Sequence, residues 1–200
     1  MKRVLAVYVW VGLMLVTAGC QSSSSDVKMP SRATQSELNQ RAKQALAELY
    51  VAMPLSKTLA PKAKAILVFP RVYKAGFIIG GQSGDGVALA PNGTPLGYFN
   101  ISAASYGLQA GAQGFSYALF VMSDEAIQYM KKSQGWEVGV GPSVVLVDEG
   151  IAKTLTTTTG KDDVYAFIFS QKGLMAGIGI QGSKITRINP AAGSSVPVAK

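Results

Sequence analysis

The chain has 200 residues, with 19 Lys and Arg against 11 Asp and Glu, and a formal net charge of +8 at pH 7. It contains no histidine, which excludes a Ser-His or Cys-His nucleophile and removes the commonest zinc ligand. Its single cysteine, Cys20, excludes an internal disulfide. The composition argues against an enzyme, and we expect no catalytic residue, no cofactor and no metal site.

The first twenty residues have the pattern of a secretory signal. Lys2 and Arg3 give a positive start, residues 4–16 carry no charge, and small residues precede Cys20. An apolar run of this length is too short to cross a bilayer and is typical of a cleaved signal segment.

The stretch Thr17-Ala18-Gly19-Cys20 resembles the lipobox of bacterial lipoproteins, in which signal peptidase II cuts before a cysteine that carries diacylglycerol. Thr17 departs from the pattern, because an aliphatic residue is usual there. The resemblance implies that residues 1–19 are removed and that Cys20 is acylated, for example with palmitate. Gln21 follows where an aspartate would favour the inner membrane, so we expect the outer membrane, facing the periplasm or the cell surface. A secreted protein with a stray cysteine, or an uncleaved anchor helix, are the alternatives.

The remaining chain divides into three parts. Residues 20–35 are serine-rich and predict a flexible tether, residues 36–190 form one domain, and residues 191–200 form a loose tail. Without residues 1–19, 17 Lys and Arg face 11 Asp and Glu, a net charge of +6. That excess suits anionic headgroups. It would also suit nucleic acid, but an exported protein rarely meets any, and we expect no such partner.

Two helices are expected at the start of the domain. Ser36 can cap the first, in which apolar residues recur at three- and four-residue steps as far as Met53. A second short helix is expected between Ser56 and Lys64, although Pro61 lies inside it. The polar face of the first helix carries Glu37, Gln40, Arg41, Gln44 and Glu48.

Glycine-broken apolar runs then predict many short strands, with a turn at residues 82–85. A third helix is expected from Ser123 to Gly135. The fold class is therefore α+β, with a mostly antiparallel, strongly curved or barrel-like sheet, packed with the N-terminal helix pair and one mid-domain helix. The expected strands are 65–69, 76–81, 86–90, 96–104, 106–113, 115–122, 136–140, 143–147, 151–157, 164–170, 174–180 and 185–188.

Three sequence patterns could be taken for catalytic or ligand-binding motifs, and none of them predicts a site. Residues 177–182 match G-x-G-x-x-G, but no helix follows and no acidic residue occurs after Asp163. The pairs Asp148-Glu149 and Asp162-Asp163 lie near glycines, which favours turns over a metal site. A Ser/Lys hydrolase is disfavoured, since Ser183 and Lys184 would point to opposite faces of a strand.

Three ordered blocks resemble the SYLF (DUF500) domain, a family of bacterial lipoproteins and of eukaryotic proteins of membrane traffic and actin patches. The first block is Ala63-Lys64-Ala65-Ile66-Leu67-Val68-Phe69-Pro70, continuing through residues 74–77 and 80–86. The second runs from Ser105 to Gln113, and the third from Phe169 to Gly177, followed by Gly182. Residues 97–100 depart from the family, many members of which have a Trp-Ser-Pro stretch there.

The resemblance implies phospholipid binding, through phosphoinositides in eukaryotic members and, in a bacterium, through anionic lipids such as phosphatidylglycerol or cardiolipin. A basic segment at the start of the domain contacts the membrane in some members, although such lysines equally fit a solvated face. One rival is a structural or interaction protein that binds an envelope or host protein. The other is a transmembrane β-barrel, which the polar helices disfavour. The expected lipid-binding residues are Lys57, Lys62, Lys64, Arg71, Lys74 and Lys172.

Overall fold

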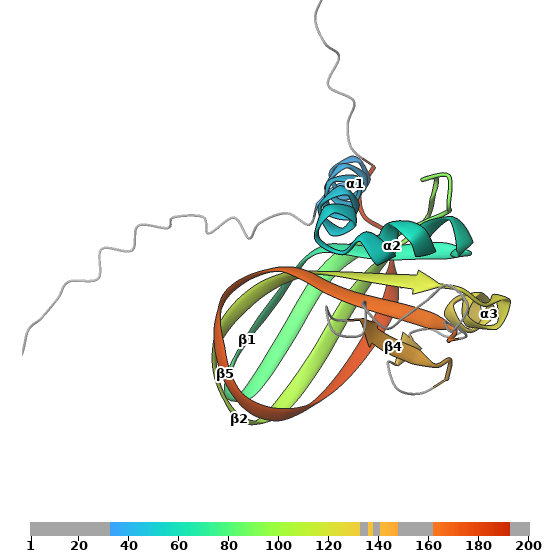
Figure 1. Ribbon diagram of the computed structural model, residues 1–200. Helices are drawn as coiled ribbons and strands as arrows, with labels where there is room; N and C mark the ends of the chain where they lie inside the picture. The colour runs from blue at the N-terminus through green and yellow to red at the C-terminus, as the bar shows by residue number, and fades with distance from the viewer. Residues whose placement is uncertain (1–32, 133–135, 138–140, 148–161, 193–200) are drawn as a thin grey trace, which may run out of the picture. The chain divides into compact units, whose positions relative to one another are not determined.

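The computed structural model describes residues 33–132, 136–137, 141–147 and 162–192 (Figure 1). By its contacts the chain separates into Met1–Ser31 and Arg32–Lys200, and the second unit holds all the described residues. The predicted signal segment, Cys20, the pair Asp148-Glu149, the strand at 151–157 and most of the predicted tail lie outside the described residues.

Helices and strands segregate along the chain in the way the α+β prediction requires, which confirms the fold class (Figure 1). Two helices come first, a third lies in mid-domain, and strands occupy most of the rest. The helices are α1 (Gln35–Ala52), α2 (Pro54–Leu59) with a 3₁₀ turn η1 (Ala60–Lys62), and α3 (Asp124–Lys132). The strands are β1 (Ala65–Leu89), β2 (Pro95–Val121), β3 (Trp136–Glu137), β4 (Val144–Val147) and β5 (Val164–Ile188).

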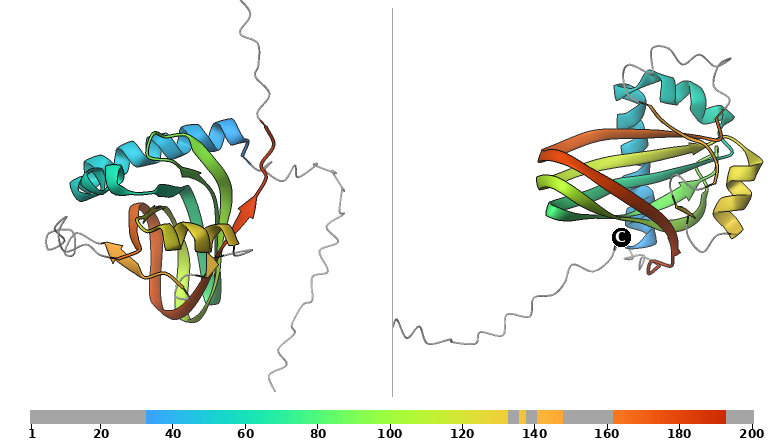
Figure 2. Two further views of the ribbon diagram at one scale, coloured as in Figure 1. Left: turned by 90° about the vertical axis from the view of Figure 1, so that its right-hand side faces the viewer. Right: turned by 90° about the horizontal axis from the view of Figure 1, so that it is seen from below.

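The sheet has the order β1-β2-β5-β3, with β4 beside β5. All pairs are antiparallel except β4 with β5. The three long strands coil together into a strongly curved, open ribbon over the described residues (Figures 1 and 2).

The predicted subdivision into short strands was wrong. Residues 82–85, expected as a turn, lie inside β1 and stay paired with β2, where Gln82 faces Ala103 and Asp85 faces Asn100. The Asn100 amide donates to the Asp85 carboxylate at 2.7 Å and to the Gly84 carbonyl at 3.2 Å. Turn-forming residues are therefore held extended by their partners on the neighbouring strand, which a local pattern does not record.

Strand β1 curls back on itself. A Cβ at Gly84 would lie 2.6 Å from the Arg71 carbonyl oxygen, and one at Gly86 would collide with the Val68 carbonyl oxygen and the Phe69 ring. The two halves of the strand thus touch at glycines, the only residues small enough for such an approach. Near the bend, a Cβ at Gly76 would likewise collide with Gly80.

Each face of the curled sheet buries its own apolar cluster. Ala118 and Phe120 of β2 lie in the cluster with α1, and this face is called the α1 face below. Tyr117 and Leu119 lie in the cluster with α3, on the α3 face. The alternation follows from the two-residue period of a strand. Burial of Tyr117 raises its pKa to about 12.

Helix α1 begins two residues earlier than predicted. Thr34, not Ser36, is the N-cap: its hydroxyl accepts from the Glu37 backbone amide at 3.3 Å, and the Glu37 carboxylate accepts from the Thr34 amide at 2.9 Å. This reciprocal pair is a capping box, which satisfies two amides at once. These hydrogen bonds lower the pKa of Glu37, that from the Thr34 backbone amide most. Ser36 is an exposed residue of the first turn.

The two ends of the described domain meet. The Gln35 amide donates to the Ala191 carbonyl at 3.0 Å, and the Gln35 side chain donates to the Pro190 carbonyl at 3.0 Å. Among the described helices, none combines the length and apolar character that a bilayer crossing requires.

Candidate functional site

Two β-bulges lie at the same level of the sheet, one on each side of β2. Phe69 of β1 pairs with Tyr117 of β2, and Val72 pairs with Phe115, so β1 contains one more residue than β2 between the two pairs. On β5, the register shifts in the same way opposite residues 114–116. A bulge bends its strand and redirects nearby side chains, and it is also a place where a strand tolerates proline, here Pro70.

Side chains from neighbouring elements satisfy the polar groups of both bulges. The Ser116 hydroxyl donates to the Pro70 carbonyl at 2.9 Å. Ser170 has a φ of 51°, an uncommon backbone conformation for a residue other than glycine, and its hydroxyl donates to Glu48 of α1 at 3.1 Å. The two bulges are thereby fixed to β2 and to α1.

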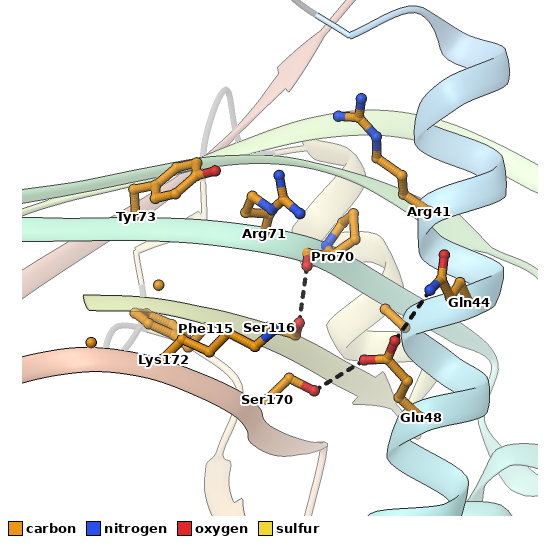
Figure 3. A pocket seen from close by; sticks show the side chains of 13 residues that line it. Arg41, Gln44, Glu48, Pro70, Arg71, Tyr73, Phe115, Ser116, Ser170 and Lys172 are labelled. Atoms are coloured by element: carbon orange, nitrogen blue, oxygen red, sulfur yellow. Dashed lines mark hydrogen bonds between the residues drawn. The ribbon is translucent and has the colours of Figure 1, made fainter. Parts of the chain in front are cut away.

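An open cavity of about 550 Å³ lies between α1 and these bulges. Three cations from three different elements line it: Arg41 of α1, Arg71 of β1 and Lys172 of β5. Figure 3 shows Arg41 and Arg71 toward one side of the cavity, and Lys172 beside Phe115 toward the other. We call this site the cationic pocket. Its remaining lining is Gln44, Ala45, Glu48, Pro70, Tyr73, Gly114, Phe115, Ser116, Ser170 and Gly173.

Positive charges outnumber negative ones in the lining of the cationic pocket, with three cations and one acid. None of Arg41, Arg71 and Lys172 forms a salt bridge within 4 Å with a described carboxylate, although the charge of Arg41 contributes to the lowered pKa of Glu37, four residues earlier on α1. Glu48 is the one acid in the lining, and its oxygens accept from Ser170 and, at 3.4 Å, from the Gln44 amide (Figure 3). The pocket therefore presents a net positive charge on exposed side chains and suits an anionic group such as a phosphate.

The six residues predicted to bind lipid do not form one surface. Arg71 and Lys172 meet in the cationic pocket. Lys57 and Lys62 are exposed on α2 and η1. Lys64 pairs with Asp124 of α3 at 3.0 Å. Lys74 is half-buried on the α3 face, in register with Gln113.

Sequence reasoning missed the third cation of the pocket. Arg41 was expected only as part of the polar face of the first helix, and that face is indeed exposed. What brings it to Arg71 and Lys172 is the packing of α1 over the two bulges, and no pattern local to the first helix carries that information.

Asp163 has a structural role in the described chain. The Asp163 carboxylate accepts from the Ser143 amide at 3.0 Å and from the Ser143 hydroxyl at 3.1 Å. Hydrogen bonds from Ser123, first, and from Ser143 lower the pKa of Asp163. Among the described residues, no three His, Cys, Asp or Glu side chains are grouped as metal ligands would be.

Helix-flanked, coiled antiparallel strands define an α+β domain, with a cationic pocket between helix and sheet. Residues 102–192 match the model of the Ysc84 family, described as Las17-binding protein actin regulator. The Ysc84 family is the SYLF family, and the match supports the SYLF domain that the sequence motifs indicate. The match covers the second and third blocks of the resemblance and the elements from most of β2 to β5. A search of curated proteins gives no match.

Proposed function

We propose that this protein is a non-catalytic, membrane-anchored lipoprotein of the outer membrane, whose SYLF domain binds anionic phospholipid through the cationic pocket. One observation carries the proposal: Arg41, Arg71 and Lys172 converge on one open cavity whose lining holds a single acid, Glu48, and none of the three forms a salt bridge with a described carboxylate. A cavity of about 550 Å³ is within the usual range for a small-molecule site and has room for a lipid headgroup.

The pocket chemistry favours a phosphate over other anions. A guanidinium presents a planar fork that matches two phosphate oxygens, and Arg41 and Arg71 supply two such forks. Lys172 adds a compact charge, and the Ser116 and Ser170 hydroxyls and the Gln44 amide offer further polar contacts. Phe115 and Tyr73 provide apolar surface for the glycerol and acyl part of a lipid.

The test is vesicle co-sedimentation of residues 21–200, which lack both the predicted signal segment and the acylated cysteine, across a salt series. We expect binding to phosphatidylglycerol vesicles that weakens with salt, and little binding to neutral phosphatidylcholine. Each basic residue near an anionic surface contributes about 1 kcal/mol, so the double variant Arg71→Gln, Lys172→Gln should bind roughly 30-fold more weakly.

The matched control is Lys57→Gln, Lys62→Gln, which removes the same charge from exposed positions outside the pocket. It should change binding much less. Equal losses in both double variants would assign the attraction to overall charge, and no binding at low salt would exclude the proposed lipid ligand.

A protein partner is the second candidate function, since the family description names Las17 binding and actin regulation. An envelope or host protein would then occupy the domain, and the anchor would serve only for location. Anionic vesicles should compete with a lipid-directed pocket and should fail to compete with such a partner.

A further inference from the structure

The bend of the coiled sheet exposes large apolar side chains that nothing in the described fold covers. They come from all three long strands, and each is between 61 % and 89 % exposed. This set is called the tip patch: Tyr73, Phe77 and Ile79 of β1, Tyr106 of β2 and Leu174 of β5. Contiguous exposed apolar surface of this kind is characteristic of binding sites rather than of ordinary protein surface.

The strand register puts all five on the α1 face. Tyr73, Phe77 and Ile79 pair with residues 114, 110 and 106 of β2, and Leu174 pairs with Ala112. These β2 positions alternate in step with Ala118 and Phe120, which pack under α1. The α1 face is therefore covered by α1 at one end of the sheet, and the tip patch is the part of the same face that remains exposed at the other end.

The backbone at the bend is strained. Ile78 has a φ of 64° and stands at the register shift between Phe77 and Ile79, yet its side chain is 44 % exposed. A positive φ is unfavourable for a β-branched residue, and such strain persists where the surrounding structure imposes it, often at functional sites. Because the Ile78 side chain is partly exposed to solvent, packing within the fold does not explain the strain.

The tip patch begins where the cationic pocket ends. Tyr73 belongs to both, and Lys172 of the pocket is two residues from Leu174 in β5. Phe77 is six residues from Arg71 in the same strand. Positive charge is thus adjacent to exposed apolar and tyrosine side chains on one face.

We propose that the tip patch enters the headgroup and outer acyl region of the same bilayer whose anionic headgroups the cationic pocket holds. The proposal rests on the proposed function and adds the way in which the domain sits on the membrane. Transfer of apolar side chains from water into the bilayer is favourable, and tyrosines favour the membrane–water interface. The cations would then lie at the level of the lipid phosphates. The hydrogen bonds among β1, β2 and β5 satisfy most of the inserted backbone.

Charge favours a bilayer over a second copy of the chain as the occupant. In a symmetric dimer formed through the tip patch, the same surface meets itself, so both copies would bring Arg71 and Lys172 to one interface. Like charges brought together at an interface oppose association, whereas an anionic bilayer complements them.

The test places a polarity-sensitive nitrobenzoxadiazole probe on single cysteines of the full-length chain carrying Cys20→Ser, which has no other cysteine. Ile79→Cys reports on the tip patch, and Val51→Cys, 84 % exposed on α1, is the control. With phosphatidylglycerol vesicles, we expect the probe at 79 to shift to the blue and to be quenched by nitroxides on the acyl chains. The probe at 51 should remain aqueous.

A variant pair supplies the second measurement. Phe77→Ser with Ile79→Ser should weaken vesicle binding at least tenfold and leave its salt dependence unchanged, whereas Val51→Ser should leave binding unchanged. All of these positions are exposed, so the fold should tolerate the changes.

The outcomes separate this proposal from the function on which it rests. Salt-dependent binding that responds to Arg71→Gln and Lys172→Gln, with an aqueous probe at 79, would overturn the insertion and retain headgroup binding. Absence of binding to anionic vesicles would overturn both. A blue shift that grows with protein concentration without vesicles would identify a second copy as the occupant and also overturn insertion.

Discussion

Glu48 and Ser170, 122 residues apart in the chain, are joined by a 3.1 Å hydrogen bond across the cationic pocket. The bond links α1 to the bulge of β5, where Ser170 has a φ of 51°. Because Gln44 and Ser170 hold Glu48, its negative charge stays beside Arg41, Arg71 and Lys172 and opposes anion binding.

Replacement of this acid should therefore strengthen the site. We expect Glu48→Gln to raise the affinity for anionic vesicles by up to about fivefold, since one charge near the membrane is worth about 1 kcal/mol. Glutamine still accepts from Ser170, so stability should change little. The control is Glu125→Gln, the same charge change at an exposed position of α3. Equal affinity gains in both variants would contradict a local effect in the pocket.

The fold-back of β1 should make Gly84 intolerant of any side chain. A Cβ there meets the Arg71 carbonyl oxygen at 2.6 Å and Val72, so Gly84→Ala should destabilise the protein by about 1–3 kcal/mol, as overpacking does. Gly81 of the same strand has only an ordinary contact, 3.7 Å to the Ala103 carbonyl oxygen. Urea unfolding should show Gly81→Ala to be near neutral, and similar losses in both variants would speak against the fold-back.

Removal of the Thr34 cap should destabilise α1. Thr34→Ala removes the acceptor of the Glu37 amide and should cost about 1 kcal/mol in the free energy of unfolding. Ser36→Ala tests the cap expected from the sequence and should have almost no effect. The opposite ranking in thermal melts would place the start of α1 at Ser36 after all.

Asp163 should make stability depend on pH in the acid range. Its pKa is lowered below 3.8 by hydrogen bonds from Ser123 and Ser143, so its stabilisation is complete above that value and is lost as pH falls through the lowered pKa. Asp163→Asn should lose roughly 1 kcal/mol at neutral pH. The difference between variant and parent should shrink toward zero as pH falls through the lowered pKa. A difference that stays constant throughout would exclude Asp163 as its source.

Much of the architecture was predictable because it depends on patterns of residues that are close together in the sequence. Apolar residues spaced three and four apart from Leu38 to Leu49 correctly predicted the buried face of α1. The apolar run 65–69 correctly predicted the start of β1. Ser123 was correctly expected to begin α3, and its hydroxyl accepts from the Ala126 amide at 3.1 Å.

What could not be predicted depends on partners distant in the chain. Residues 82–85 look like a turn until Asn100 pairs beside them, and nothing near Arg41 indicates that it will face Lys172. A bulge is an extra residue relative to a partner strand, so it has no meaning until the register is known. Arg71 and Lys172 were singled out by charge and family resemblance, but their meeting in one pocket was not.

The contact of Gln35 with Pro190 and Ala191 bears on how such a domain can be built into larger proteins. Because the chain enters and leaves at one point, the domain could occupy a surface loop of another protein without parting the strands of its host. For the same reason, circular permutation is feasible: a short linker from residue 192 to residue 33, with new ends in the Ala90–Thr94 turn, should preserve every strand pairing.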